Sequence, residues 1–151
     1  MAKLHEVHQS RQRIHVMEKM NGCAIYGADL HLPHMLYAKG VVTGCPYGEI
    51  RAIHTEEALN IPGVRGVYTA EDIPGHNGFG AFCKDEPILA ERYVKFAGDV
   101  VAVVVADSPV LAEQGAKAVR VELTPLKPVL TVEEALSGEI VINPAYPDNL
   151  C

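Results

Sequence analysis

The sequence predicts an α+β domain in which short helices lie against one face of a mixed sheet that carries a protruding β-hairpin. Residues 100–106, VVAVVVA, are too few to span a membrane and too continuously apolar for a half-exposed strand, so they predict a strand covered on both faces. The next residues, Ser108 and Pro109, are typical of a helix start. With 151 residues, 48% hydrophobic and 21% charged, the chain fits one domain with a core of ordinary size.

The first third of the chain predicts an arm and a hairpin. Residues 1–21 are polar and rich in His, Lys and Arg, which indicates an N-terminal arm ahead of a domain at residues 22–142. Residues 35–42 are strand-like, residues 45–48 form a turn, and residues 49–54 alternate as the returning strand. Together they predict one long β-hairpin.

A short helix and another strand follow. Thr55, followed by two glutamates, predicts a helix that starts with a hydroxyl cap and two carboxylates at the positive end of its dipole. Pro62-Gly63 ends this helix, and residues 64–69 predict the next strand.

The helix after residues 100–106 is predicted to lie close against the sheet. Its small side chains recur at i, i+3, i+4 and i+7, at Ala112, Gly115, Ala116 and Val119. Residues 119–123 predict a further strand. Thr131 and Glu134 form a capping-box pattern for a last short helix. Gly138 ends that helix, and residues 143–151 predict a linker that leaves the domain.

The longest loop, residues 74–87, is the predicted binding surface if the chain binds anything. Its segment 75–80, GHNGFG, has the glycine content of a phosphate loop. It lacks the Lys-Ser/Thr pair and does not lie between a strand and a helix, so a mobile surface loop is the favoured interpretation.

No residue pattern predicts a catalytic, cofactor or metal site. His31 and His34 are separated by a proline that prevents a shared helix face, and no third ligand is indicated. The pairs Glu56-Glu57 and Glu133-Glu134 point about 100° apart on a helix, so they are helix-start charges. The cysteines are widely scattered, and none has a local activating group; they are Cys23, Cys45, Cys83 and Cys151.

The charge balance excludes two classes of partner. The formal net charge of −6 disfavours nucleic acid and anionic membranes, whose binding depends on clustered Lys and Arg. No segment predicts a signal peptide or a spanning helix, so a cytoplasmic location with reduced cysteines is expected.

Several ordered motifs resemble one family. They are GCAIYGADLHLPHMLY at 22–37, ALNIPGV at 58–64, YTAEDIP at 68–74, GDVVAVVVA at 98–106 and VRVEL at 119–123. The match, over about residues 22–136, is similar to the α/β-hammerhead domain of the molybdenum-binding subunit of the xanthine dehydrogenase and aldehyde oxidase family. There are departures: the turn at residues 45–48 is short, His54 replaces a common aspartate, and Asp99 stands where Gln or Glu is usual.

The resemblance implies a structural, non-catalytic domain of a molybdenum hydroxylase. The family's molybdopterin-binding segments and catalytic glutamate lie in later domains, so this chain is expected to bind no cofactor. Its parent enzyme would hydroxylate a purine, another heterocycle or an aldehyde with water as oxygen source, and would use Fe–S clusters and FAD in partner domains or subunits. The expected partners are molybdenum-binding domains of the same or an adjacent gene product, with self-association through exposed apolar residues.

A second function remains open at this point. A free-standing binding or interaction module could share the fold and use residues 74–87 as its binding surface.

Overall fold

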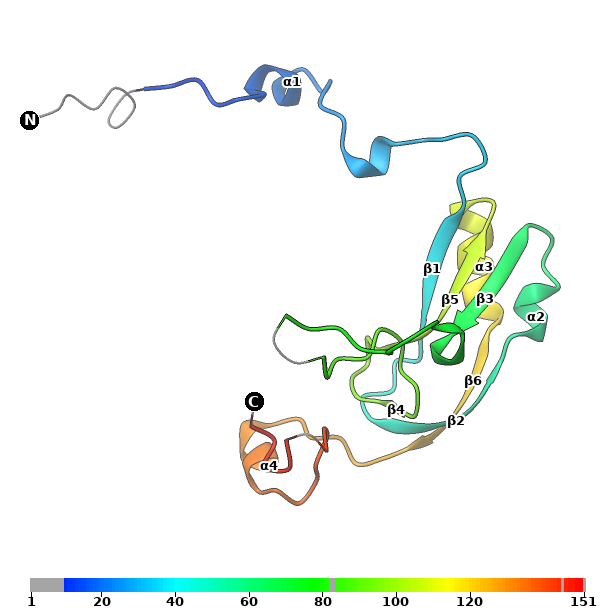
Figure 1. Ribbon diagram of the computed structural model, residues 1–151, viewed down its shortest axis with the longest axis vertical. Helices are drawn as coiled ribbons and strands as arrows, with labels where there is room; N and C mark the ends of the chain where they lie inside the picture. Colours follow the sequence, from blue (N-terminus) through cyan, green and yellow to red (C-terminus); the bar gives the residue numbers. More distant parts are fainter. Residues whose placement is uncertain (1–9, 82–83, 145, 151) are drawn as a thin grey trace, which may run out of the picture. The chain divides into compact units, whose positions relative to one another are not determined.

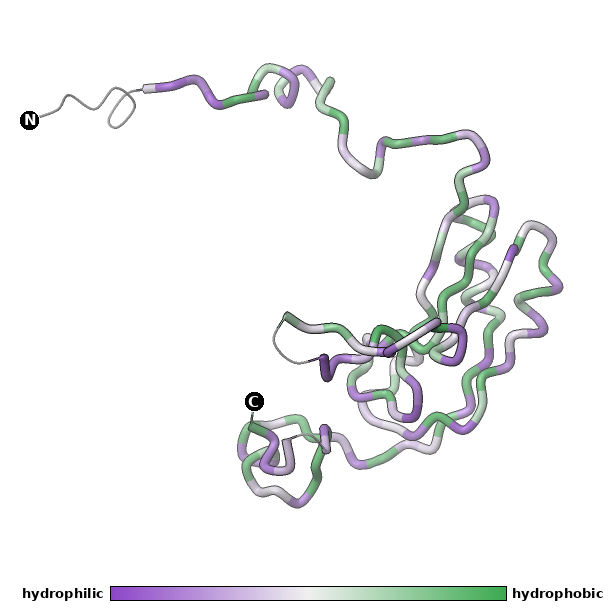
Figure 2. Tube along the Cα trace, in the orientation of Figure 1, coloured by the Kyte–Doolittle hydropathy of each residue, from purple (hydrophilic) through white to green (hydrophobic). Residues whose placement is uncertain are grey.

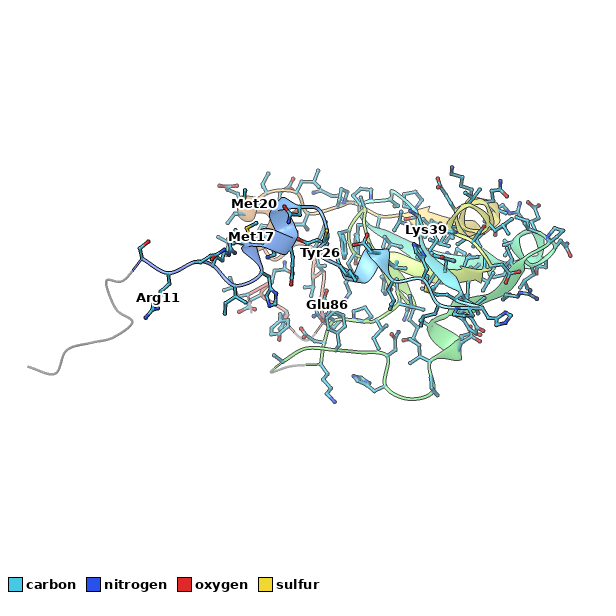
Figure 3. The ribbon with its side chains drawn as sticks, turned by 90° about the horizontal axis from the view of Figure 1, so that it is seen from above. Arg11, Met17, Met20, Tyr26, Lys39 and Glu86 are labelled. Carbon is cyan, nitrogen blue, oxygen red and sulfur yellow. The ribbon has the colours of Figure 1, made fainter. Side chains whose placement is uncertain are left out.

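The computed structural model describes residues 10–81, 84–144 and 146–150. The chain divides into two units, residues 1–35 and 36–151. The first unit holds helix α1 (Val16–Met20) and one 3-10 turn, η1 (Gly27–Asp29). On α1 the side chains of Met17 and Met20 are exposed (Figure 3). No side chain within residues 10–35 is buried, so the described part of this unit has no core of its own.

The second unit contains two three-stranded sheets (Figure 1). Sheet A has the order β1 (Tyr37–Val42), β5 (Val100–Ala106), β3 (Val64–Thr69). Sheet B has the order β4 (Tyr93–Val94), β2 (Gly48–His54), β6 (Arg120–Pro125). All four strand pairings are antiparallel.

Strand β5 is the centre of sheet A, as its apolar run predicts (Figure 2). Val101 and Val104 on this strand are fully buried. Helix α3 (Pro109–Ala118) packs on β5 and on its neighbour β1. The Ser108 hydroxyl accepts a hydrogen bond from the Leu111 N–H at 3.2 Å, which confirms the predicted cap. The small-residue stripe is confirmed as well, since Ala112 and Gly115 are buried.

The predicted hairpin of residues 35–54 is wrong. Strand β1 pairs with β5, whereas β2 pairs with β4 and β6, so these consecutive strands lie in different sheets. The expected mixed sheet is accordingly two antiparallel sheets. Alternation of apolar residues identifies a strand but not its hydrogen-bonding partner, which tertiary packing decides. The α+β class itself is confirmed, and residues 43–47 carry the chain from sheet A to sheet B.

The two other predicted helices, at residues 56–59 and 132–136, are present, but only the second has the predicted N-terminal cap. Helix α2 (Glu56–Leu59) has no side-chain cap, so the predicted hydroxyl cap at Thr55 is wrong; this residue has helical backbone angles, φ −109° and ψ −9°. Helix α4 (Val132–Leu136) has the predicted capping box, because the Thr131 hydroxyl accepts from the Glu134 N–H at 3.2 Å and the Glu134 carboxylate accepts from the Thr131 N–H at 3.3 Å.

The chain after α4 turns back on this helix. The Asn149 side-chain NH2 donates to the carbonyls of Ala135 at 3.0 Å and Ile140 at 2.7 Å, and its oxygen accepts from the Ile142 N–H at 3.1 Å. Four elements were not predicted: helix α1, the 3-10 turn η1, the 3-10 turn η2 (Ala70–Asp72) and strand β4. Among the described residues, no helix is long and apolar enough to cross a membrane.

Candidate functional site

The loop at residues 74–87 is the candidate site, and its described part is held by hydrogen bonds. The Phe79 N–H donates to the Glu86 carbonyl at 2.8 Å, which forms an isolated antiparallel bridge. Nε2 of His76 lies 3.2 Å from the Lys84 carbonyl oxygen. The loop therefore has two arms that run alongside each other (Figure 1). We call the described residues of these arms, 76–81 and 84–88, the finger.

Asn77 anchors the base of the finger to the core. Its side-chain oxygen accepts from the Ile88 N–H at 3.0 Å and the Leu89 N–H at 3.1 Å, and its NH2 donates to the Leu89 carbonyl at 2.8 Å. Leu89 is only 6% exposed. Sequence reasoning missed this role, although Asn before Gly is typical of turns in which the amide side chain bonds to the backbone.

A pocket lies between the finger and the turn that joins β4 to β5. Its volume is about 410 Å³, and it opens to solvent. Apolar walls come from Phe79, Pro87, Ile88 and Phe96. Charged side chains at the same pocket are Asp85, Glu86, Lys95 and Asp99. Glu86 lies on the finger (Figure 3), and we call this cavity the finger pocket.

Asp99 closes the turn at the far wall of the finger pocket. Its Oδ2 accepts from the Lys95 N–H at 3.0 Å, and its own N–H donates to the Phe96 carbonyl at 3.0 Å. The residue as a whole is 7% exposed, so most of Asp99 is buried at the wall of an open cavity. The sequence marks Asp99 only as a departure from the family pattern, because burial cannot be read from one polar residue between glycine and valine.

The finger pocket does not fit the phosphate of a molybdopterin cofactor. A phosphate cradle needs free backbone N–H groups. In the adjoining loop the Gly75 and Gly78 N–H groups, whose residues do not line the pocket, donate to the carbonyls of Ile73 and His76, and the N–H of Phe79, which does line it, is used in the bridge. The three carboxylates at the pocket would also repel an anion.

None of the other described residues weighed from the sequence lines this pocket. His31 and His34 are exposed in the first unit, and no group of three His, Cys, Asp or Glu in the described ranges could hold a metal ion. Cys23 is exposed, and the half-buried Cys45 thiol donates to the Tyr47 carbonyl at 3.2 Å. Cys83 and Cys151 lie outside the described residues.

The two glutamate pairs begin helices in the structure. Glu56 and Glu57 lie in the first turn of α2. Glu133 and Glu134 lie in the first turn of α4, where the Leu130 N–H donates to Glu134 at 2.9 Å and so lowers the pKa of that carboxyl. This carboxylate is occupied in capping its helix.

Comparison with known proteins identifies the family. Residues 21–127 match the family model described as aldehyde oxidase and xanthine dehydrogenase, a/b hammerhead domain. The chain is 35% identical over 131 residues to the nicotinate dehydrogenase large molybdopterin subunit of Eubacterium barkeri, covering 87% of this chain and 31% of that protein. It is 36% identical over 127 residues to a probable xanthine dehydrogenase subunit of Bacillus subtilis, covering 84% and 17%.

Solved structures agree with the sequence matches. The aldehyde oxidoreductase of Desulfovibrio gigas superposes with a TM-score of 0.84 at 33% identity, over 89% of this chain and 16% of that one. The quinoline 2-oxidoreductase of Pseudomonas putida 86 superposes with a TM-score of 0.83 at 31% identity, over 90% and 18%.

The chain therefore belongs to the aldehyde oxidase and xanthine dehydrogenase family, of which it carries the α/β-hammerhead domain. It spans about a third or less of the length of these relatives.

Proposed function

We propose that the chain is a structural, non-catalytic domain that works as part of a molybdenum hydroxylase. The observation that carries this proposal is the mismatch in coverage: 87% of this chain corresponds to 31% of a molybdopterin subunit. The proposed domain boundaries are an arm at 1–21, the hammerhead domain at 22–142 and a linker at 143–151. The proposed reaction of the whole enzyme is hydroxylation of a purine, another heterocycle or an aldehyde with water as oxygen source.

Exposed apolar side chains support a docking role. Leu130, Val132 and Leu136, on and before α4, are 74%, 69% and 60% exposed. Phe79, Ile88 and Phe96 at the finger pocket are 52%, 49% and 56% exposed. Gathered apolar exposure is typical of surfaces that another protein covers. The proposed partners are the molybdenum-binding domains, which would supply the molybdopterin cofactor, while Fe–S clusters and FAD belong to further domains or subunits.

The test is reconstitution with a polypeptide that carries the molybdenum-binding domains from the same genome. We expect the purified chain alone to contain no stoichiometric molybdenum by elemental analysis and to oxidise neither hypoxanthine nor an aldehyde. Co-expression should give one complex on size-exclusion chromatography that contains molybdenum. Independent elution of the two polypeptides, or stoichiometric molybdenum in the chain alone, would refute the proposal; an unrelated acidic protein is the control partner.

A second candidate function is a free-standing interaction module that uses residues 74–87. The finger pocket favours this second function, because a preformed cavity of this kind can bind a group of another protein. Capture of a partner without molybdenum domains through this pocket would decide for the module.

A further inference from the structure

Two strand edges of the domain open onto one groove. Among the described strands, β1 is the end strand of sheet A and pairs only with β5, while β6 is the end strand of sheet B and pairs only with β2. A cavity of about 470 Å³ that opens to solvent is lined by residues of β1, β6 and α3. We call this cavity the edge groove.

The edge groove faces the backbone of β1 rather than one face of sheet A. Its lining includes five consecutive residues, 39–43. Successive side chains of a strand point to opposite faces, so a cavity over one face would be lined by every second residue only. Among the described residues, the backbone groups of residues 39–43 form hydrogen bonds with no segment other than β5. The groove therefore runs along a strand edge whose outward N–H and C=O groups are unpaired within the described chain.

Apolar side chains line the edge groove beside this backbone. Val42 on β1 is 53% exposed. Ala116 on α3 and Val121 and Leu123 on β6 line the groove and are half-buried. Alternate side chains of a segment added to β1 point to opposite faces, so one set can contact these apolar groups while the backbone pairs with the strand.

The edge groove is basic although the whole chain is acidic, with a net charge of −6. Lys39, Lys117 and Arg120 line it, against the single carboxylate of Glu113. Lys117 binds Glu113 at 2.8 Å, and this hydrogen bond, followed by the charges of Lys117 and Lys39, lowers the pKa of Glu113. None of the ion pairs among the described residues includes Lys39, which lies on the edge strand itself (Figure 3). Positive charge without an ion-pair partner thus lies beside the free edge.

A lysine on an edge strand can also have a purely protective role. Its charge then keeps other strands from pairing with the edge. That role accounts for Lys39, but it requires neither a cavity along the edge nor the further cations that line this cavity. A positive groove also discriminates between guests, because it repels a basic segment and attracts an acidic one.

We propose that the edge groove binds an extended acidic segment of another protein, which adds to the free edge of β1 as a further strand of sheet A. Backbone hydrogen bonds to residues 39–43 hold this segment. Its Asp or Glu side chains contact Lys39 and Arg120, and its apolar side chains contact Val42 and Leu123. The inference does not rest on the proposed function, because the edge, the charge and the cavity all belong to this chain.

The first experiment titrates the full chain with a blocked hexapeptide of alternating glutamate and valine. Its extended length of roughly 20 Å is sufficient to cover residues 39–43. NMR should show shifts of the backbone amide signals of residues 39–43 and 119–123, with cross-strand contacts between the peptide and β1. The same peptide with lysine in place of glutamate should bind about tenfold more weakly.

N-methylated peptides test the backbone pairing separately from the charge. Alternate N–H groups of a strand point to the same edge, and N-methylation removes the donor. One version of the acidic peptide is methylated at its valines and a second version at its glutamates. At least one version should lose binding. Retained binding by both would show that the peptide does not add to the strand and would overturn the proposal.

A matched pair of variants tests the charge. Lys39→Gln should weaken binding of the acidic peptide by about threefold to tenfold, and NaCl should reduce this difference. Lys127→Gln removes the same charge from a side chain that is 67% exposed and does not line the groove, so it should bind the peptide normally. Both variants should keep the urea midpoint of the parent chain. If Lys39→Gln fails to fold, Arg120→Gln replaces it with the same expectation.

Several results would overturn the inference. Absence of binding by the acidic peptide, or equal binding of the lysine peptide, would leave Lys39 with the protective role alone. An equal loss of binding in Lys39→Gln and Lys127→Gln would show that only the overall charge matters. If the amide signals of residues 39–43 shift with protein concentration when no peptide is present, a second copy of the chain occupies the edge, and the assignment of an acidic segment from another protein is wrong.

Discussion

Gly115 of α3 lies directly over Val104 of β5, so closely that a Cβ on the glycine would come within 2.7 Å of Cγ1 of Val104. The same Cβ would lie 3.2 Å from Cγ2 of Val64 on β3. A helix residue without a side chain thus sets the distance between α3 and sheet A.

Gly115→Ala should destabilise the domain. Alanine gains about 1 kcal/mol of helix propensity over glycine. The contact with the fully buried Val104 costs about 1–3 kcal/mol through overpacking, so the loss should prevail. Urea unfolding measures the change. Val104→Ala alone should cost about 1–3 kcal/mol through lost burial and a cavity, and Val103→Ala, at a half-buried position, should cost less.

The double variant tests the contact itself. Because the alanine at 104 makes room for the new Cβ, Gly115→Ala with Val104→Ala should be less destabilised than the sum of the single variants. Strict additivity would show that the two positions do not touch.

Because of Asp107, the stability of the domain should fall with pH in the acid range, below the usual pKa of an aspartate. Arg65 donates to Asp107 from Nε to Oδ1 at 2.7 Å and from Nη2 to Oδ2 at 2.8 Å, and these hydrogen bonds lower the pKa of Asp107 from its usual 3.8. A carboxyl with a lowered folded-state pKa stabilises the fold above its unfolded pKa and loses that contribution as the pH falls through the folded value.

Asp107→Asn should therefore lower the Tm slightly at pH 7 and make its fall below a pH of about 4 shallower. Thermal melts from pH 2 to 7 measure this, and 1 M NaCl should reduce the difference because both partners are exposed. An unchanged acid profile, equal to that of a Glu57→Gln control, would contradict the assignment.

Asn77→Ala should release the finger from the core. The substitution removes the oxygen that accepts from the Ile88 and Leu89 N–H groups. Leu89 is a buried residue, so its N–H would be left without an acceptor. Hydrogen exchange at these two amides should accelerate, and the free energy of unfolding should fall by about 1–3 kcal/mol. Exchange at Val103 and Val104 in the middle of β5, which do not line the finger pocket, serves as the internal control. Unaltered protection at Leu89 would mean that the side chain does not hold the base.

Exposed aromatic residues predict self-association of the isolated chain. The hypothesis is that sedimentation shows larger species as concentration rises, and that Phe79→Ser with Phe82→Ser reduces them while the cooperative melt is kept. Phe79 is 52% exposed, and Phe82 lies outside the described residues. If the chain sediments only as a monomer at high concentration, the self-association hypothesis is wrong, and the exposed surface is that of a domain that needs no partner.

Local signals in the sequence were sufficient for the elements that depend on neighbours in the chain. Ser108 and Thr131 cap their helices, and Gly115 packs on the sheet, because spacing and side-chain chemistry decide these features. The predicted hairpin was wrong because the hydrogen-bonding partner of β1 is β5, a strand far away in the sequence. The finger pocket could not be predicted either, because its walls come from two separate segments, the loop with Phe79 and the turn with Phe96 and Asp99, and only the tertiary fold brings these together.

The crossing of the chain between its sheets also has a consequence for biosynthesis. Every strand pairing joins one of the first three strands, β1, β2 and β3, to one of the last three, β4, β5 and β6. On the ribosome the first three emerge with no strand to pair with, and they stay unpaired until their partners follow. Such non-local topology folds slowly and leaves strand edges open to other chains. The nascent polypeptide is thus most vulnerable to aggregation while residues 70–125 are being translated.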